Sequence, residues 1–195
     1  MHISRMLMLI SAVLLISGLF DRALERAGSN KLEALFFLLC TAALDRFVLE
    51  QIKGAAVSPA CIFTLAAALY IEHRPKGRKR LKPLRALLAL AFGTAAAPLM
   101  ALESEWACYA AAVIFASAAL VFEAASALAI SFAASLFACA AAQIYAGFEY
   151  GIMEIEIGDA CLAVQMASLL TVLTINEFVS NRVKVRNRSY ERPIN

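Results

Sequence analysis

Residues 106–148 read WACYAAAVIFASAALVFEAASALAISFAASLFACAAAQIYAGF, an apolar run interrupted only by Glu123, Gln143 and scattered serines. As one helix, this run would be about 65 Å long at about 1.5 Å per residue, twice the ~30 Å hydrocarbon core of a bilayer. The chain must therefore reverse direction within it. We place the turn near Glu123, although no glycine or proline marks it, which predicts two membrane spans at about 106–123 and 126–148.

The amino-acid composition is that of a chain that prefers lipid to water. Hydrophobic residues make up 62% of the 195 residues, charged residues make up 17%, and the mean hydropathy is +0.74. These values exceed those of soluble globular proteins, in which about half of the residues are apolar. The composition therefore predicts a membrane protein.

Five further apolar runs approach the roughly 20 residues that a helix needs to cross a bilayer. They lie at about 3–20, 32–52, 54–72, 84–102 and 160–179. Together the runs predict an all-α, polytopic membrane protein with seven transmembrane helices. One transmembrane domain covers 1–180, and a basic tail follows at 181–195. Six spans are the alternative, in which 106–148 crosses only once.

A basic segment between the third and fourth runs sets the predicted orientation. The sequence HRPKGRKRLKPLR at 73–85 contains no acid and seven basic residues, which are Arg74, Lys76, Arg78, Lys79, Arg80, Lys82 and Arg85. Basic residues beside membrane spans are retained on the cytoplasmic side during insertion. We therefore predict that this segment is cytoplasmic and that the protein lies in the plasma (inner) membrane.

Counting spans outward from this segment places every basic block on the cytoplasmic side. No Lys or Arg occurs between Arg85 and Arg182, and the acidic segments 103–105 and 149–159 fall outside. The N-terminus is then outside and the C-terminus is cytoplasmic. Six spans would place the basic tail outside, so the charge distribution favours seven. The first run lacks a small-residue cleavage site, which favours a retained helix over a signal sequence.

The most informative polar cluster is LDRFVLEQIK at 44–53, inside the second predicted span. Arg46 and Glu50 are four residues apart and would share one face of a helix, whereas Asp45 would point elsewhere. Ionisable side chains inside a span are costly and commonly mark a substrate or ion path. Near the end of a span they also pair with each other and reach the interface. Both interpretations stay open, and structural pairing is the simpler one.

Further polar residues give two weaker sets of candidates. Gln143 and Gln165 either line a path or form hydrogen bonds between helices, and the second use is the commoner one. Glu154, Glu156 and Asp159 belong to an acidic segment that offers oxygen ligands to a hard divalent cation. A solvated acidic loop is the simpler interpretation of that segment.

Five cysteines lie in or beside the apolar runs, and none has the C-x-x-C spacing of a metal or redox motif. Packing between helices is the simplest role, and a disulfide among Cys61, Cys108 and Cys161 is the alternative. An internal similarity relates PACIFTLAAAL at 59–69 to DACLAVQMASL at 159–169. Parallel repeats occur in transporters, although alanine-rich segments also align by chance.

Enzyme motifs are missing from the sequence, which contains no G-x-S-x-G, G-x-x-x-x-G-K-[ST] or H-E-x-x-H and only two histidines. We therefore expect neither an enzyme nor a cofactor. The basic segment lacks the aromatic residues of a nucleic-acid site, so its expected partner is anionic lipid. The leading hypothesis is a carrier or channel for a small solute or ion. The alternative is a non-catalytic membrane subunit or scaffold, bound to a partner protein or to a second copy.

Overall fold

Helices account for most of the computed structural model, which describes residues 3–47, 49–52, 55–73, 83–102, 105–150 and 155–190. The described helices are α1 (Ile3–Ile16), α2 (Asp21–Ala27), α3 (Lys31–Leu44), α4 (Pro59–Glu72), α5 (Pro83–Met100), α6 (Glu105–Ala116), the 3-10 helix η1 (Ser117–Leu120), α7 (Ala124–Tyr150) and α8 (Asp159–Tyr190). The strands are β1 (Leu49–Ile52), β2 (Ala55–Val57) and β3 (Ile155–Ile157). The helical class is thus confirmed, with a small sheet that was not predicted.

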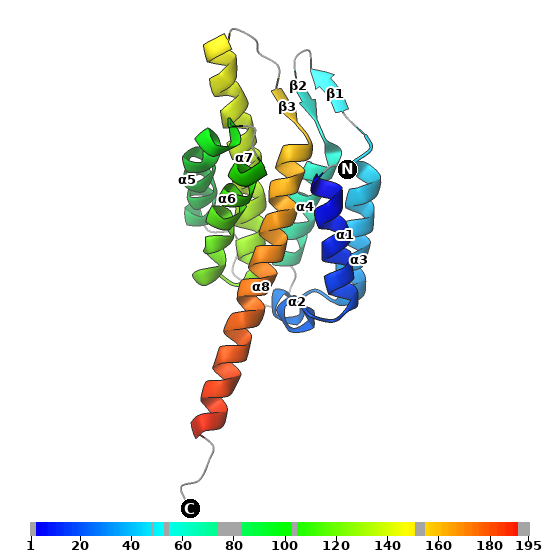
Figure 1. Ribbon diagram of the computed structural model, residues 1–195, viewed down its shortest axis with the longest axis vertical. Helices are drawn as coiled ribbons and strands as arrows, with labels where there is room; N and C mark the ends of the chain where they lie inside the picture. The colour runs from blue at the N-terminus through cyan, green and yellow to red at the C-terminus, as the bar shows by residue number, and fades with distance from the viewer. Residues whose placement is uncertain are drawn as a thin grey trace, which may run out of the picture.

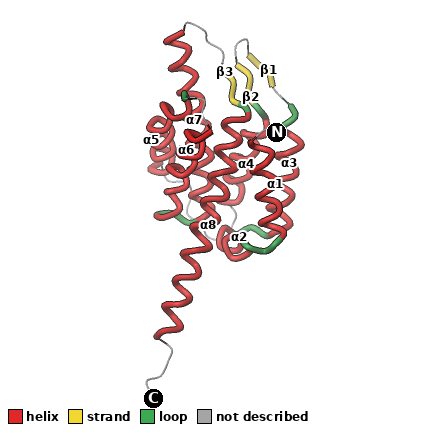
Figure 2. Tube along the Cα trace, viewed as in Figure 1, coloured by secondary structure: helices red, strands yellow, loops and turns green. Residues whose placement is uncertain are grey.

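The bundle is elongated, and its two ends differ (Figure 1). The three strands and the start of α1 lie at one end, which we call the sheet end (Figure 2). The short helix α2 lies at the opposite end, which we call the α2 end. The predicted basic tail at 181–195 continues α8 as far as Tyr190, and this part of the helix extends beyond the bundle at the α2 end.

Most helices are shorter than a membrane span. α1, α3 and α4 have 14 residues each. At 1.5 Å per residue such a helix is about 21 Å long, against about 30 Å of hydrocarbon. In the described chain two helices are long and apolar enough to cross a membrane, at Ala124–Tyr145 and Asp159–Val179. α1 and α2, bent by 97°, make a third if they form one span. The seven predicted spans are therefore not confirmed.

The second and third predicted spans are not continuous helices. α3 ends at Leu44, and the apolar residues that follow form the antiparallel pair β1–β2, with Leu49 opposite Val57. The prediction of helix throughout 32–52 and 54–72 is wrong at this end of the bundle. Short apolar segments suit a buried strand and a buried helix alike, so hydropathy alone did not separate the two.

The predicted reversal within the long apolar run is confirmed. α6 ends at Ala116, η1 follows, and α7 begins at Ala124, so that two separate helices pack against each other. Glu123 is exposed in the turn, and its carbonyl oxygen accepts a hydrogen bond of 2.9 Å from the amide of Ala127. This bond starts the hydrogen-bonded ladder of α7.

The sheet joins segments that lie far apart in the sequence. β2 pairs with β3 in parallel, with Ala55 opposite Ile155 and Val57 opposite Ile157. The amide of Ser58 extends the pairing with a hydrogen bond of 2.7 Å to the carbonyl of Ile157. β2 leads into α4 and β3 leads into α8, the two helices that contain the similar sequences. The paired strands therefore place the two similar segments side by side and in the same direction.

Small residues bring the helices close together. Gly93 of α5 faces α7, where a Cβ atom at this position would lie 2.7 Å from Phe137 Cβ and 2.9 Å from the Ala134 carbonyl oxygen. Alanines fill much of the buried interior, including Ala111 and Ala138, which are fully buried. Contacts of this type are typical of helices that pack without a water-driven hydrophobic effect.

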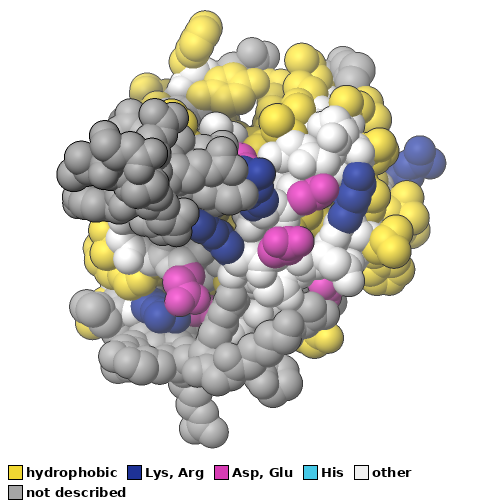
Figure 3. Space-filling model, turned by 90° about the horizontal axis from the view of Figure 1, so that it is seen from below, with side chains coloured by type: hydrophobic (Ala, Val, Ile, Leu, Met, Phe, Trp, Pro, Cys, Tyr) yellow, Lys and Arg dark blue, Asp and Glu magenta, His cyan; other side chains and the backbone are white. Residues whose placement is uncertain are grey.

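The sides of the bundle carry large exposed apolar side chains. Leu39 of α3, Val13 of α1 and Val113 of α6 are 70%, 64% and 60% exposed. Seen from the α2 end, acidic and basic side chains are interspersed on the face of the bundle, and hydrophobic side chains lie around them (Figure 3). This distribution is the one expected of a bundle whose sides contact lipid and whose ends contact water.

Candidate functional site

Asp45, Arg46 and Glu50 do not lie on one helix. Asp45 follows the last residue of α3, and its Oδ2 lies 3.0 Å from Nε of Arg5 at the start of α1. Arg46 is exposed in the following turn, and Glu50 lies in β1 opposite Ala56. The prediction that Arg46 and Glu50 share one helical face is wrong, because α3 ends before both residues.

Gln165 connects two helices. It is fully buried in α8, its Oε1 accepts a hydrogen bond of 2.7 Å from Thr64 Oγ1, and its Nε2 donates one of 3.2 Å to the carbonyl of Cys61. Thr64 Oγ1 also lies 2.9 Å from that carbonyl. Of the two predicted uses, Gln165 shows the interhelical hydrogen bond. Gln143 is half-buried on α7.

Three buried thiols adjoin this cluster. Cys161 interacts with the thiols of Cys61 and Cys139, and its Sγ lies 4.0 Å from Ser135 Oγ. The five cysteines are free thiols. The disulfide that was the alternative prediction for Cys61, Cys108 and Cys161 is therefore not formed, and the buried neighbours of Cys161 are Cys61 and Cys139.

The acidic candidates are only partly described. Asp159 is the first residue of α8 and accepts a hydrogen bond from Ser4 Oγ of α1. Glu156 pairs through its backbone with Ala56, and Glu154 lies outside the described residues. In the described ranges no group of three or more His, Cys, Asp or Glu side chains is placed to hold a metal ion.

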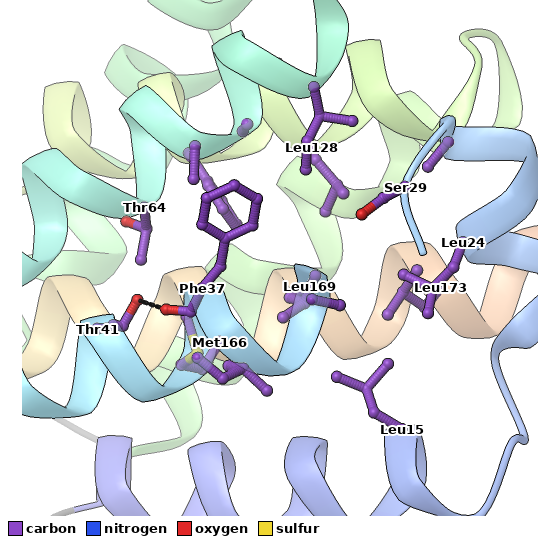
Figure 4. A pocket seen from close by; sticks show the side chains of 17 residues that line it. Leu15, Leu24, Ser29, Phe37, Thr41, Thr64, Leu128, Met166, Leu169 and Leu173 are labelled. Carbon is purple, nitrogen blue, oxygen red and sulfur yellow. Dashed lines mark hydrogen bonds between the residues drawn. The ribbon is translucent and has the colours of Figure 1, made fainter. Parts of the chain in front are cut away.

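An apolar cavity of about 80 Å³ lies among α1, α2, α3, α4, α7 and α8 (Figure 4). Most of its wall is hydrocarbon, from side chains such as Leu15, Phe37, Leu128, Met166 and Leu173. Figure 4 shows these residues converging on the cavity from several helices. Apolar cavities stay dry and take up apolar ligands.

The few polar side chains in the cavity wall are already hydrogen-bonded. Thr41 Oγ1 donates to the carbonyl of Phe37 at 2.8 Å, and Ser29 Oγ donates to Glu33 Oε2 at 2.9 Å. Thr64 donates to Gln165, as described above. The wall therefore offers a ligand almost no unpaired polar group and no ring of oxygen ligands.

A second polar cluster lies where α4 ends and where α5 and α7 begin. Glu72 Oε1 lies 2.5 Å from Arg85 Nη1 and accepts a hydrogen bond of 2.9 Å from Ser126 Oγ. Arg85 Nη1 also lies 2.9 Å from Ser126 Oγ, and its guanidinium lies 5.7 Å from the centre of the Phe122 ring. The side chains of Glu72 and Arg85 are 2% and 18% exposed.

Glu72 Oε2 is buried and has no hydrogen-bond partner among the described residues. An ionised carboxylate oxygen is an acceptor, and a buried acceptor without a donor is unfavourable. Glu72 lies one helical turn beyond Ala68 on the buried face of α4, and Ala68 lines the cavity. The polar cluster is not itself part of the cavity wall, but it lies one helical turn beyond the wall residue Ala68.

Glu72 was not among the predicted site residues, and Arg85 was predicted only to set the orientation. Arg74, Lys76, Arg78, Lys79, Arg80 and Lys82, the rest of that basic set, lie outside the described residues. The sequence does contain one indication of this pair. Glu72 ends one apolar run, and Arg85, 13 residues later, begins the next run. A hairpin of two helices brings such residues together.

No protein-family model, curated protein or solved structure matches the chain. The cavity and the Glu72 cluster are therefore the features from which a function can be inferred.

Proposed function

We propose that the protein is a multi-pass membrane carrier that binds a small apolar or amphiphilic solute in the cavity among α1–α4, α7 and α8. The observation that carries the proposal is the apolar cavity, whose polar side chains are already hydrogen-bonded within the protein. An ion would need several oxygen ligands, which this wall does not offer. A hydrocarbon group needs only the apolar surface that is present.

The proposed arrangement keeps seven helices in the plasma membrane, with the N-terminus outside and the α2 end in the cytoplasm. The basic residues Arg22 and Arg85 lie at the α2 end, and the extension of α8 carries further basic residues there. This distribution supports the orientation, because basic residues favour the cytoplasmic side. Anionic lipid head groups are the proposed partners of this face.

In this proposal the longer helices α7 and α8 span the bilayer at its ordinary thickness. The shorter helices cross where the bilayer is locally thinner. The large exposed apolar side chains on the sides, such as Val13 and Leu39, support contact with lipid. The three strands cover the outer ends of the short helices in this arrangement.

The proposal is tested by photolabelling the purified protein in lipid nanodiscs with a diazirine derivative of octane. Peptide mass spectrometry should locate label at the cavity residues Phe37, Leu128 and Met166, besides label at lipid-facing Leu39. Ala67→Leu, which fills part of the cavity, should reduce the cavity label selectively. The matched control is Ala110→Leu on the exposed side of α6, which should leave the cavity label unchanged.

Label confined to lipid-facing residues would contradict a cavity that binds solutes. The scaffold interpretation would then be the better one, because it requires exposed apolar faces but no internal site.

A further inference from the structure

We propose that Glu72 Oε2 accepts a hydrogen bond from the hydroxyl head group of a neutral amphiphile, a medium-chain or long-chain alcohol, whose hydrocarbon chain occupies the cavity. This inference rests on the proposed function and names its solute class. The starting observation is the buried carboxylate oxygen that has no donor among the described residues.

The ligand must supply a hydrogen-bond donor, because Glu72 Oε1 already has hydrogen-bond partners and Oε2 has none among the described residues. Oε1 is occupied by Arg85 Nη1 at 2.5 Å and by Ser126 Oγ at 2.9 Å. Oε2 keeps its lone pairs within a side chain that is 2% exposed. An ionised carboxylate accepts hydrogen bonds but donates none, and ether, ester and ketone head groups are also acceptors only. Such head groups therefore cannot form a hydrogen bond with Oε2. A hydroxyl group supplies the missing donor.

The head group is neutral because the protein already balances the charge at this site. The carboxylate of Glu72 is paired with the guanidinium of Arg85, and both are largely withdrawn from water. A cationic head group would compete with Arg85 for the carboxylate, and an anionic one would be repelled by Glu72. Either would leave an extra charge in a poorly hydrated place, which is costly. A hydroxyl group adds a hydrogen bond without adding a charge.

The hydrocarbon chain has a place close to this oxygen. Ile71 of α4 lines the cavity and immediately precedes Glu72, and Ala68 lines it one helical turn earlier on the buried face of α4. Ala68, Leu128 and Phe132 belong to one packed apolar cluster. An acceptor one helical turn beyond the wall of an apolar cavity is placed to bind the head group of an amphiphile whose tail fills the cavity.

The test compares two photoreactive probes of the same chain length, a diazirine-bearing octanol and the same diazirine-bearing octane. In nanodiscs the alcohol should label the peptides that contain Ala68–Ile71 and Leu128 about tenfold more than the hydrocarbon does, the preference expected of one hydrogen bond to a buried charged acceptor. The double variant Glu72→Leu with Arg85→Leu removes both charges and the acceptor, and it should remove this preference. Labelling by the hydrocarbon should persist in it.

Asp45→Asn is the matched control, because it also neutralises an ion-paired carboxylate but lies at the sheet end, away from Glu72. It should keep most of the alcohol preference. A wild-type protein that is labelled equally by both probes at these peptides would overturn the alcohol assignment and leave the apolar carrier standing. Cavity residues that neither probe labels would overturn both proposals.

A second measurement keeps the assignment testable if the double variant does not fold. Infrared difference spectra of the wild-type protein should show a shifted carboxylate stretching band on addition of octanol and an unchanged band on addition of octane. Solvated surface carboxylates already bond to water and should contribute little to this difference. An unchanged carboxylate band with octanol would contradict the hydrogen bond to Glu72.

Discussion

The two buried polar clusters of the bundle differ in how completely their hydrogen bonds are satisfied. The cluster of Thr64, Gln165 and the Cys61 carbonyl is neutral, and every side-chain group in it has a partner. The cluster of Glu72, Arg85 and Ser126 is charged, and one carboxylate oxygen has no partner among the described residues. A neutral cluster in which every group has a hydrogen-bond partner holds helices together. A charged cluster with an unpaired acceptor can also accept a hydrogen bond from a ligand.

Arg85→Gln should lower the free energy of unfolding more than the other variants do, because it leaves the carboxylate of Glu72 buried without its counter-ion. Removal of one partner of a buried ion pair typically costs about 3–5 kcal/mol. The double variant with Glu72→Gln should recover most of this loss, since no unpaired charge remains. Unfolding in mixed micelles, followed by circular dichroism, measures the free energies. Equal stability of the single and double variants would show that the pair is not coupled.

In the neutral cluster, Gln165→Leu should cost about 1–2 kcal/mol, because it removes hydrogen bonds but leaves no charge behind. Thr64 Oγ1 keeps its bond to the Cys61 carbonyl, which limits the loss. The same unfolding assay applies. A loss as large as that of Arg85→Gln would remove the distinction between the clusters.

Ser126→Ala separates structure from binding within the charged cluster. It removes a donor from Glu72 Oε1, but Arg85 Nη1 still bonds to that oxygen, so we expect a loss of about 0.5–1.5 kcal/mol. The melting temperature in detergent is the readout. A melting temperature lowered as strongly as that of Arg85→Gln would mean that the serine, rather than the guanidinium, holds the carboxylate.

The smallest change in stability is expected when the ion pair of Arg5 and Asp45 at the sheet end is broken. The side chain of Arg5 is 50% exposed and that of Asp45 is 10% exposed. Exposed pairs contribute about 0–1 kcal/mol and weaken with salt. Asp45→Asn should therefore lower stability slightly at low ionic strength and less at high ionic strength. A large, salt-independent loss would place Asp45 with the buried groups.

Hydropathy predicted the principal helices and the break near Glu123, because both depend on the length of apolar runs. It did not predict the sheet, whose strands lie within or beside those runs and have apolar residues at most positions. Charge spacing suggested Arg46 and Glu50, but this suggestion assumed a helix that ends at Leu44. The pair of Glu72 and Arg85 depends on the tertiary arrangement of two helices, and no local spacing indicates it.

The parallel pairing of β2 with β3 has a consequence for the order of events during synthesis. The partner of Ala55 is Ile155, so one edge of β2 has no strand to pair with until the ribosome has made the intervening residues. At about 5–20 residues per second this interval lasts about 5–20 s. Until then this edge of β2 stays open, and its pairing with β3 completes the sheet.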